Sequence, residues 1–128
     1  MNQSISNAKS SRIVDIYSRI DSFVLVVLYF TKTVPRTLEG IEIVKQLIRS
    51  VCSIGANANE ADGTLTKKEF LHVFSIARRE AKETKYWLVL LSKLNPELSN
   101  TLEPIIKENQ ELILILSKII SSSRKSDL

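Results

Sequence analysis

Apolar residues recur every three or four positions along four separate segments of this 128-residue chain. That spacing places them on one face of an α-helix, and no alternation of period two is long enough to predict a sheet. The predicted helices span about 11–33, 38–62, 67–94 and 101–121, within one domain over 11–123. We expect a disordered tail at 1–10 and a frayed tail at 124–128. Because the connections are short, the sequence predicts an all-α fold, an antiparallel up-down-up-down four-helix bundle.

Each helix has an apolar stripe that we expect to face the core. The first stripe comprises Ile13, Ile16, Ile20, Phe23, Val27, Phe30 and Val34. The second comprises Ile41, Val44, Ile48, Val51 and Gly55. The third comprises Phe70, Phe74, Ala77, Ala81, Thr84, Leu88 and Leu91. The fourth comprises Leu102, Ile105, Leu112, Leu116 and Ile119, with Asn109 as a polar exception. Pro35 closes the first helix, and Thr37 can cap the second.

The composition excludes several classes of protein. A single cysteine, Cys52, rules out an intramolecular disulfide framework, and its apolar neighbours predict a buried, inert thiol. The longest apolar run, residues 23–30, is too short to cross a bilayer, and the first residues lack the apolar stretch of a signal peptide. We therefore expect a cytoplasmic protein with no membrane partner. The net charge of +4 is compatible with an acidic partner without requiring one.

The run FVLVVLYF at 23–30 is apolar on every face of its helix, although a bundle helix needs only one buried stripe. An exposed apolar patch of this kind marks an interface more often than it does not. The sequence therefore predicts self-association, against the alternative of a wide core stripe. The predicted interface residues are Val24, Leu25, Val26, Leu28 and Tyr29.

Residues 58–69 are close to the loop of a calcium-binding EF-hand. However, Ala58 stands at the first ligand position and has no side-chain oxygen, while calcium needs six to eight oxygen ligands. The same residues are also typical of a corner in which a turn connects two helices. Gly63 can end one helix in the left-handed conformation, and Thr66 with Glu69 forms a capping box for the next. We favour the corner, and a calcium- or metal-binding regulator is the alternative function.

Polar residues form two groups on the second and third helices. Ser53, Asn57 and Glu60 share one face of the second helix, and Glu80 and Glu83 share a flank of the third. They could line a pocket, but a polar network that fixes helix register explains them equally and is favoured. His72 is the only histidine and is expected at the surface. No catalytic triad, phosphate loop or zinc spacing is present, so we expect no enzyme activity and no cofactor.

Basic residues follow one flank of the third helix, with no aromatic residue between them. A solvated helix face explains such a flank in a monomer. Several copies in a ring would instead offer a basic surface to a phosphate backbone, although not one that stacks bases. The candidate nucleic-acid-binding residues are Lys67, Arg78, Arg79, Lys82 and Lys85.

Three stretches carry a resemblance to a known family. They are SIGANANEA at 53–61, KKEFLHVFSIA at 67–77 and REAKETKYWLVLL at 79–91. With this separation they resemble the bacterial four-helix-bundle family related to proteins encoded by intervening sequences of 23S ribosomal RNA genes. The likeness covers roughly residues 13–122 and departs from the family pattern at Lys82 and at Ala58–Asn59. The motif residues are Ser53, Asn57, Glu60, Glu83, Tyr86 and Trp87.

The resemblance implies a non-enzymatic scaffold or interaction module that assembles as a homo-oligomer, most often a pentamer. A more distant branch is similar to accessory proteins of diversity-generating retroelements, which bind RNA and a reverse transcriptase. By that analogy, RNA or a reverse-transcriptase-like protein is an expected partner.

Overall fold

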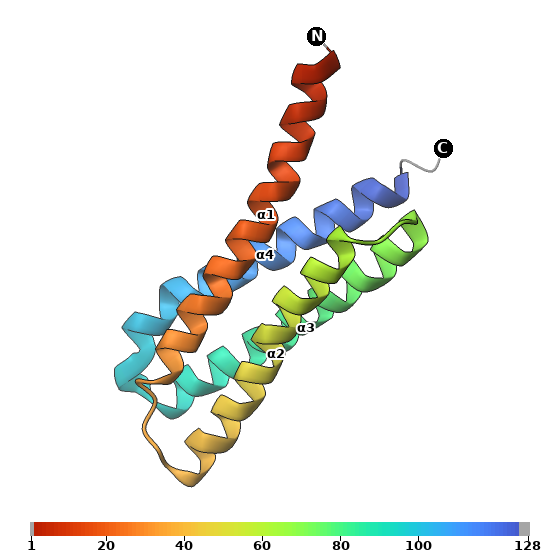
Figure 1. The fold of residues 1–128 in the computed structure, drawn as a ribbon. Coiled ribbons are helices and arrows are strands. Elements are labelled where there is room, and N and C mark those ends of the chain that lie inside the picture. The colour runs from red at the N-terminus through yellow and green to blue at the C-terminus, as the bar shows by residue number, and fades with distance from the viewer. Residues whose placement is uncertain (1, 126–128) are drawn as a thin grey trace.

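The computed structural model describes residues 2–125, with side chains described from Ile16 onward. Its four α-helices are α1 (Asn2–Thr31), α2 (Leu38–Asp62), α3 (Lys67–Leu94) and α4 (Ser99–Lys125), with a short 3₁₀ helix, η1 (Pro96–Leu98), before α4 (Figure 1). No strand occurs within residues 2–125. This confirms the predicted all-α four-helix bundle.

Two helix ends differ from the sequence prediction. α1 begins at Asn2 instead of near Ser11, so residues 2–10 continue the helix where a tail was expected. No proline or glycine interrupts residues 2–31, and these first turns extend beyond the ends of the other helices (Figure 1). At the other end α4 includes Arg124 and Lys125, which were placed in the frayed tail. The rest of that tail, 126–128, lies outside the described residues.

The helices do not pack equally closely. α2 and α3 run side by side along their length, and α3 also packs against α4 (Figure 1). α1 approaches α2 over a shorter stretch and α4 over a shorter one still, because it diverges from the bundle toward its N-terminal end. The bundle is therefore most tightly built around α3 and more open along α1.

Three of the four predicted core stripes are confirmed. In the first, every residue whose side chain is described is buried, from Ile16 to Val34. In the third, all members are buried except Phe70, which packs against the edge of the core. In the fourth, Ile120 is buried in place of Ile119, and the polar exception Asn109 is fully buried.

The predicted stripe of α2 is wrong except at Val51, which is fully buried. Ile41 and Ile48 remain 40% and 36% exposed, and Val44 and Gly55 are only half-buried. α2 has apolar residues on two faces. The face that enters the core has smaller side chains and extends further toward the C-terminal end of the helix. The buried residues of α2 are Gly40, Leu47, Ser50, Val51, Ile54, Ala58 and Ala61.

Buried polar groups tie the helices together. The Thr84 hydroxyl of α3 lies 2.9 Å from Ser50 Oγ of α2 and 2.8 Å from its own helix's Glu80 carbonyl oxygen. Asn109 Nδ2 of α4 donates to the Ala81 carbonyl oxygen of α3 at 3.2 Å. Its Oδ1 has no partner among the described residues. The Thr84–Ser50 and Asn109–Ala81 bonds each fix the register of α3 against a neighbour, because a buried polar group without a partner is costly.

Residues 58–70 form a corner between α2 and α3. Ala58 is buried in the core, and Thr66 accepts a hydrogen bond from the Glu69 backbone N–H at 3.1 Å, which confirms the Thr66 half of the predicted capping box. Gly63 differs from the prediction, because its φ is −94° and not left-handed. Its N–H and that of Thr64 instead bond to carbonyl oxygens three residues back, so a tight turn ends the helix.

Candidate nucleic-acid interface

Basic side chains line a shallow depression on the outer face of α3. Its lining consists of His72, Ser75, Ile76, Arg78, Arg79 and Lys82, and its volume is about 390 Å³. These residues follow one another at helical spacing, so successive turns of α3 bring them together. No carboxylate is among the lining residues. The depression therefore has three permanent positive charges, a hydroxyl and an imidazole facing solvent.

These cations differ from Arg19 and Arg49, which are paired inside the bundle. Arg19 makes a two-pronged ion pair with Glu108, with Nε and Nη2 at 2.7 and 2.6 Å from the carboxylate oxygens. This hydrogen bond raises the pKa of Arg19. Among the residues whose side chains are described, none forms an ion pair or hydrogen bond with Arg78, Arg79 or Lys82. Their charge is consequently available to an external anion.

The other two predicted nucleic-acid-binding residues lie elsewhere. Lys85 points toward α4, where its Nζ donates to Gln110 Oε1 at 2.7 Å. Lys67 is at the start of α3 and lines a separate pocket with Tyr17 and Asp62 at the α2–α3 corner. Burial raises the pKa of Tyr17 there, with a smaller contribution from Asp62. The structure thus gathers three of the five candidates and adds His72 and Ser75.

The polar motif residues have separate structural roles. Glu83 and Glu80 of α3 both bind Arg49 of α2 across the seam between the helices. Asn57 bonds instead to the Ser53 carbonyl oxygen of its own helix at 2.8 Å. These residues therefore form helix contacts, and they do not converge on a common pocket.

The aromatic part of the motif lies beside these contacts. Trp87 packs against the core, and its indole N–H is buried without an acceptor among the described residues. Tyr86 is 58% exposed and meets the Trp87 ring edge-on. Tyr86 also follows Lys82 by one helical turn. An aromatic ring therefore stands next to the basic depression, although the sequence had suggested none.

The predicted interface on α1 divides into two groups. Leu25, Val26 and Tyr29 are 53%, 49% and 65% exposed, which leaves a solvent-facing apolar patch as expected. Val24 and Leu28 instead pack against the core and are half-buried. The patch available to a second molecule is therefore narrower than predicted.

Other expected features have plain outcomes. Cys52 is exposed, which corrects the prediction of a buried thiol, because the core face of α2 passes through its neighbour Val51 instead. His72 is exposed as predicted.

In the part of the chain described, no three His, Cys, Asp or Glu side chains are grouped as metal ligands would be. No described helix has the length and apolarity to cross a membrane.

A comparison with models of known protein families identifies the family of this chain. The model of the 23S rRNA-intervening sequence protein family matches residues 12–118, which include all three motif stretches. The chain belongs to this family. The match confirms the resemblance seen in the motifs and extends over most of the bundle.

A solved structure from the same group supports the family assignment. The chain is similar to a protein of unknown function from the S23 ribosomal protein family of Bacteroides thetaiotaomicron. The TM-score is 0.78 at 28% sequence identity, over 85% of this chain and 97% of the other. No curated protein matches the chain. The family and its fold are thus shown, whereas the solved relative is described as a protein of unknown function.

Three residues of the depression were not among the predicted binding residues. His72 was expected at the surface without a role, and its neighbours Ser75 and Ile76 were given none. Their spacing to Arg79 and Lys82 is helical, so a search for the full outer face of α3 would have found them. Which cations lack a partner depends on α2 and α4, and one helix alone does not show it.

Proposed function

We propose that this protein is a self-associating interaction module whose basic α3 face binds the phosphate backbone of RNA. The observation that carries the proposal is the depression with Arg78, Arg79 and Lys82, three cations without internal partners. Phosphate contacts from arginine and lysine supply most of the affinity for nucleic acid. The family's description, which refers to 23S rRNA, supports RNA as the nucleic acid.

Self-association strengthens such an interface. Leu25, Val26 and Tyr29 offer an apolar patch that one bundle leaves in water. Each added copy brings another +4 of charge, so an assembly would attract RNA more strongly than a monomer. The resemblance in the motifs suggests five copies.

One set of variants tests both parts. RNA binding is followed by fluorescence anisotropy at several salt concentrations, and light scattering gives the mass relative to 14.5 kDa. Arg79→Glu with Lys82→Glu should weaken binding about tenfold or more and reduce the salt slope by about 0.7 for each lost contact. Lys107→Glu with Lys118→Glu, an equal charge change on the outer face of α4, is the matched control. Leu25→Glu with Val26→Glu should lower the mass.

Three outcomes would contradict the proposal. The absence of RNA binding at low salt would remove the RNA part, as would equal weakening by the α3 and α4 reversals. A wild-type protein that is monomeric at micromolar concentration would remove the self-association part. Because the mass and the anisotropy are measured separately, the two parts can fail independently.

A further inference from the structure

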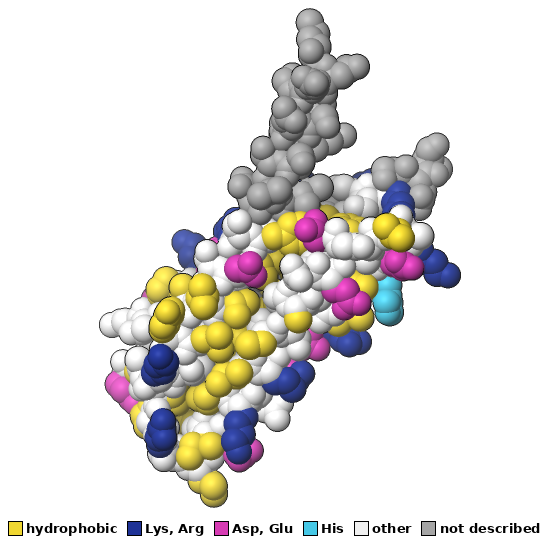
Figure 2. Space-filling view, in the orientation of Figure 1, with side chains coloured by type: hydrophobic (Ala, Val, Ile, Leu, Met, Phe, Trp, Pro, Cys, Tyr) yellow, Lys and Arg dark blue, Asp and Glu magenta, His cyan; other side chains and the backbone are white. Residues whose placement is uncertain are grey.

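α2 presents a second apolar stripe to solvent. Ile41, Val44 and Ile48 follow one another at helical spacing, and none of them is fully buried. Figure 2 shows a hydrophobic band in this region, between the C-terminal part of α1 and the N-terminal part of α2. Leu38, at the start of α2, is 81% exposed. An apolar face of this length without a covering element indicates a binding surface.

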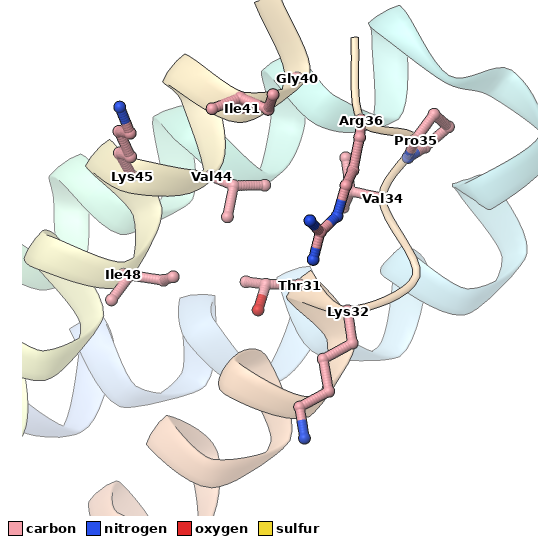
Figure 3. Close-up of a pocket in the computed structure, with 10 residues that line it drawn as sticks. All are labelled: Thr31, Lys32, Val34, Pro35, Arg36, Gly40, Ile41, Val44, Lys45 and Ile48. Carbon is pink, nitrogen blue, oxygen red and sulfur yellow. The ribbon is translucent and has the colours of Figure 1, made fainter.

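The stripe lines a groove of about 630 Å³ between α1 and α2 (Figure 3). Val34 and Pro35 of the connecting loop close one end of the groove. Gly40 lets this loop lie close against α2, because a Cβ atom there would lie 2.5 Å from the Pro35 carbonyl oxygen. Thr37 accepts a hydrogen bond from the Gly40 N–H at 3.0 Å and caps α2. The cap and this close approach therefore join the loop to the first turn of α2.

The groove has a basic edge. Lys32, Arg36 and Lys45 are among the residues that line it, and no carboxylate is among them. The Arg36 side chain extends toward Thr31, across the space between the loop and α1 (Figure 3). Lys32 lies 5.3 Å from the centre of the Tyr29 ring, and Lys45 lies 3.5 Å from an exposed Glu42 carboxylate. The cations Lys32, Arg36 and Lys45 outnumber this one carboxylate, so the edge remains positive.

We propose that the α1–α2 groove docks an acidic amphipathic helix of another protein. Two neighbouring helices leave a trough that a third helix fits, and apolar residues at positions i, i+3 or i+4, and i+7 would cover Ile41, Val44 and Ile48. Aspartate or glutamate beside that stripe would meet Lys32, Arg36 and Lys45. The proposal does not depend on RNA binding, because α3's depression lies on a different helix.

The α3 and α4 faces of a second copy fit the groove less well. The outer face of α3 carries Arg79 and Lys82, so it would bring like charges together. The outer face of α4 alternates in sign at Glu103, Lys107 and Glu111. A partner with its own acidic helix satisfies both the apolar floor and the basic edge.

A displayed library of helical peptides tests the proposal on the full-length protein. Selected peptides should share an apolar stripe of period three to four flanked by Asp or Glu. For a synthetic peptide from the selection, Lys32→Glu/Arg36→Glu/Lys45→Glu should weaken binding about tenfold or more. This variant should instead accept the same peptide with lysine in place of its acidic residues. Ile48→Asp should weaken both peptides, with circular dichroism to verify that the variant is folded.

The matched control is Lys93→Glu/Lys107→Glu/Lys118→Glu, an equal charge change at exposed positions away from the groove. It should bind the selected peptide as the wild type does. A library that yields no binder, binders rich in lysine, or binders that tolerate the groove reversal would overturn the proposal. If only the Leu25→Glu/Val26→Glu variant lost binding, the peptides would bind to the α1 patch. That result would also overturn the proposal.

Discussion

Where α2 meets α3, side chains find their partners inside the protein, whereas α1 leaves several of its side chains to solvent. Arg49 binds Glu80 and Glu83 across the α2–α3 seam, and the Thr84 hydroxyl meets Ser50 in the core. On α1, by contrast, Leu25, Val26 and Tyr29 are about half exposed or more. The α2–α3 contacts are formed within one chain, whereas α1 leaves apolar side chains exposed to solvent.

The difference separates two uses of apolar sequence. Residues in the α2–α3 region set the stability of the bundle, because their burial does not require another molecule. Residues on the outer side of α1 and on the second stripe of α2 contribute little to a single bundle. Their burial contributes a favourable free energy only when a partner covers them. Mutations in the two regions should therefore give different phenotypes.

The largest expected effect comes from a matched pair of leucines. Leu88 of α3 is fully buried and Leu25 of α1 is 53% exposed. Leu88→Ala should lower the free energy of unfolding by about 2–5 kcal/mol, since it leaves a cavity. Leu25→Ala should change the stability of the folded monomer by about 0.5 kcal/mol or less. Denaturant titration measures both, and similar losses would show that α1 is not the more open region.

A pair of glycines tests how closely α1 and its loop approach α2. A Cβ on Gly40 would lie 2.5 Å from a backbone oxygen, so Gly40→Ala should cost roughly 1–3 kcal/mol. A Cβ on Gly55 would lie 3.4 Å from Val24 Cγ2 of α1, close to an ordinary contact. Gly55→Ala should therefore raise stability by up to about 1 kcal/mol through helix propensity. Thermal unfolding measures the stability of both variants. Destabilisation by Gly55→Ala would mean that α1 packs closely against α2 at this position.

The smallest effect concerns the corner at the end of the α2–α3 seam. Thr66→Ala removes the cap of α3 and should cost about 1 kcal/mol, while Thr66→Ser should keep most of it. The loss should be the same with calcium and with EDTA, because Ala58 and Thr66 act in folding and not as ligands. A calcium-dependent rise in stability that Glu69→Gln abolishes would instead favour the metal-binding alternative.

Periodicity alone predicted the fold but chose the wrong face of α2. In α1 and α3 the stripe selected by periodicity, which includes Phe23, Phe30 and Phe74, is also the buried face. In α2 the buried face ends in Ala58 and Ala61, whose small side chains stand among polar motif residues. The bulkier Ile41 and Ile48 looked more like core residues. A helix that is apolar on two faces needs its neighbours' positions to decide between them.

The candidate site was predictable in part. The spacing of Arg78 and Lys82 placed them on a common flank of α3, which the structure retains. The sequence did not indicate that Lys85 would bond to Gln110, since those residues come from different helices. The lack of partners for Arg79 and Lys82 is likewise a property of the packed bundle. Tertiary contacts, and not local pattern, decide which charges remain available.

The exposed position of Cys52 gives the protein a ready chemical handle. It is the chain's only cysteine, so a maleimide dye or a nitroxide would attach at one defined point on α2 without any prior substitution. In an assembly of identical copies, every label would occupy an equivalent position. A single distance distribution between the spins would then report the spacing of subunits, and its form would distinguish a pair from a closed ring.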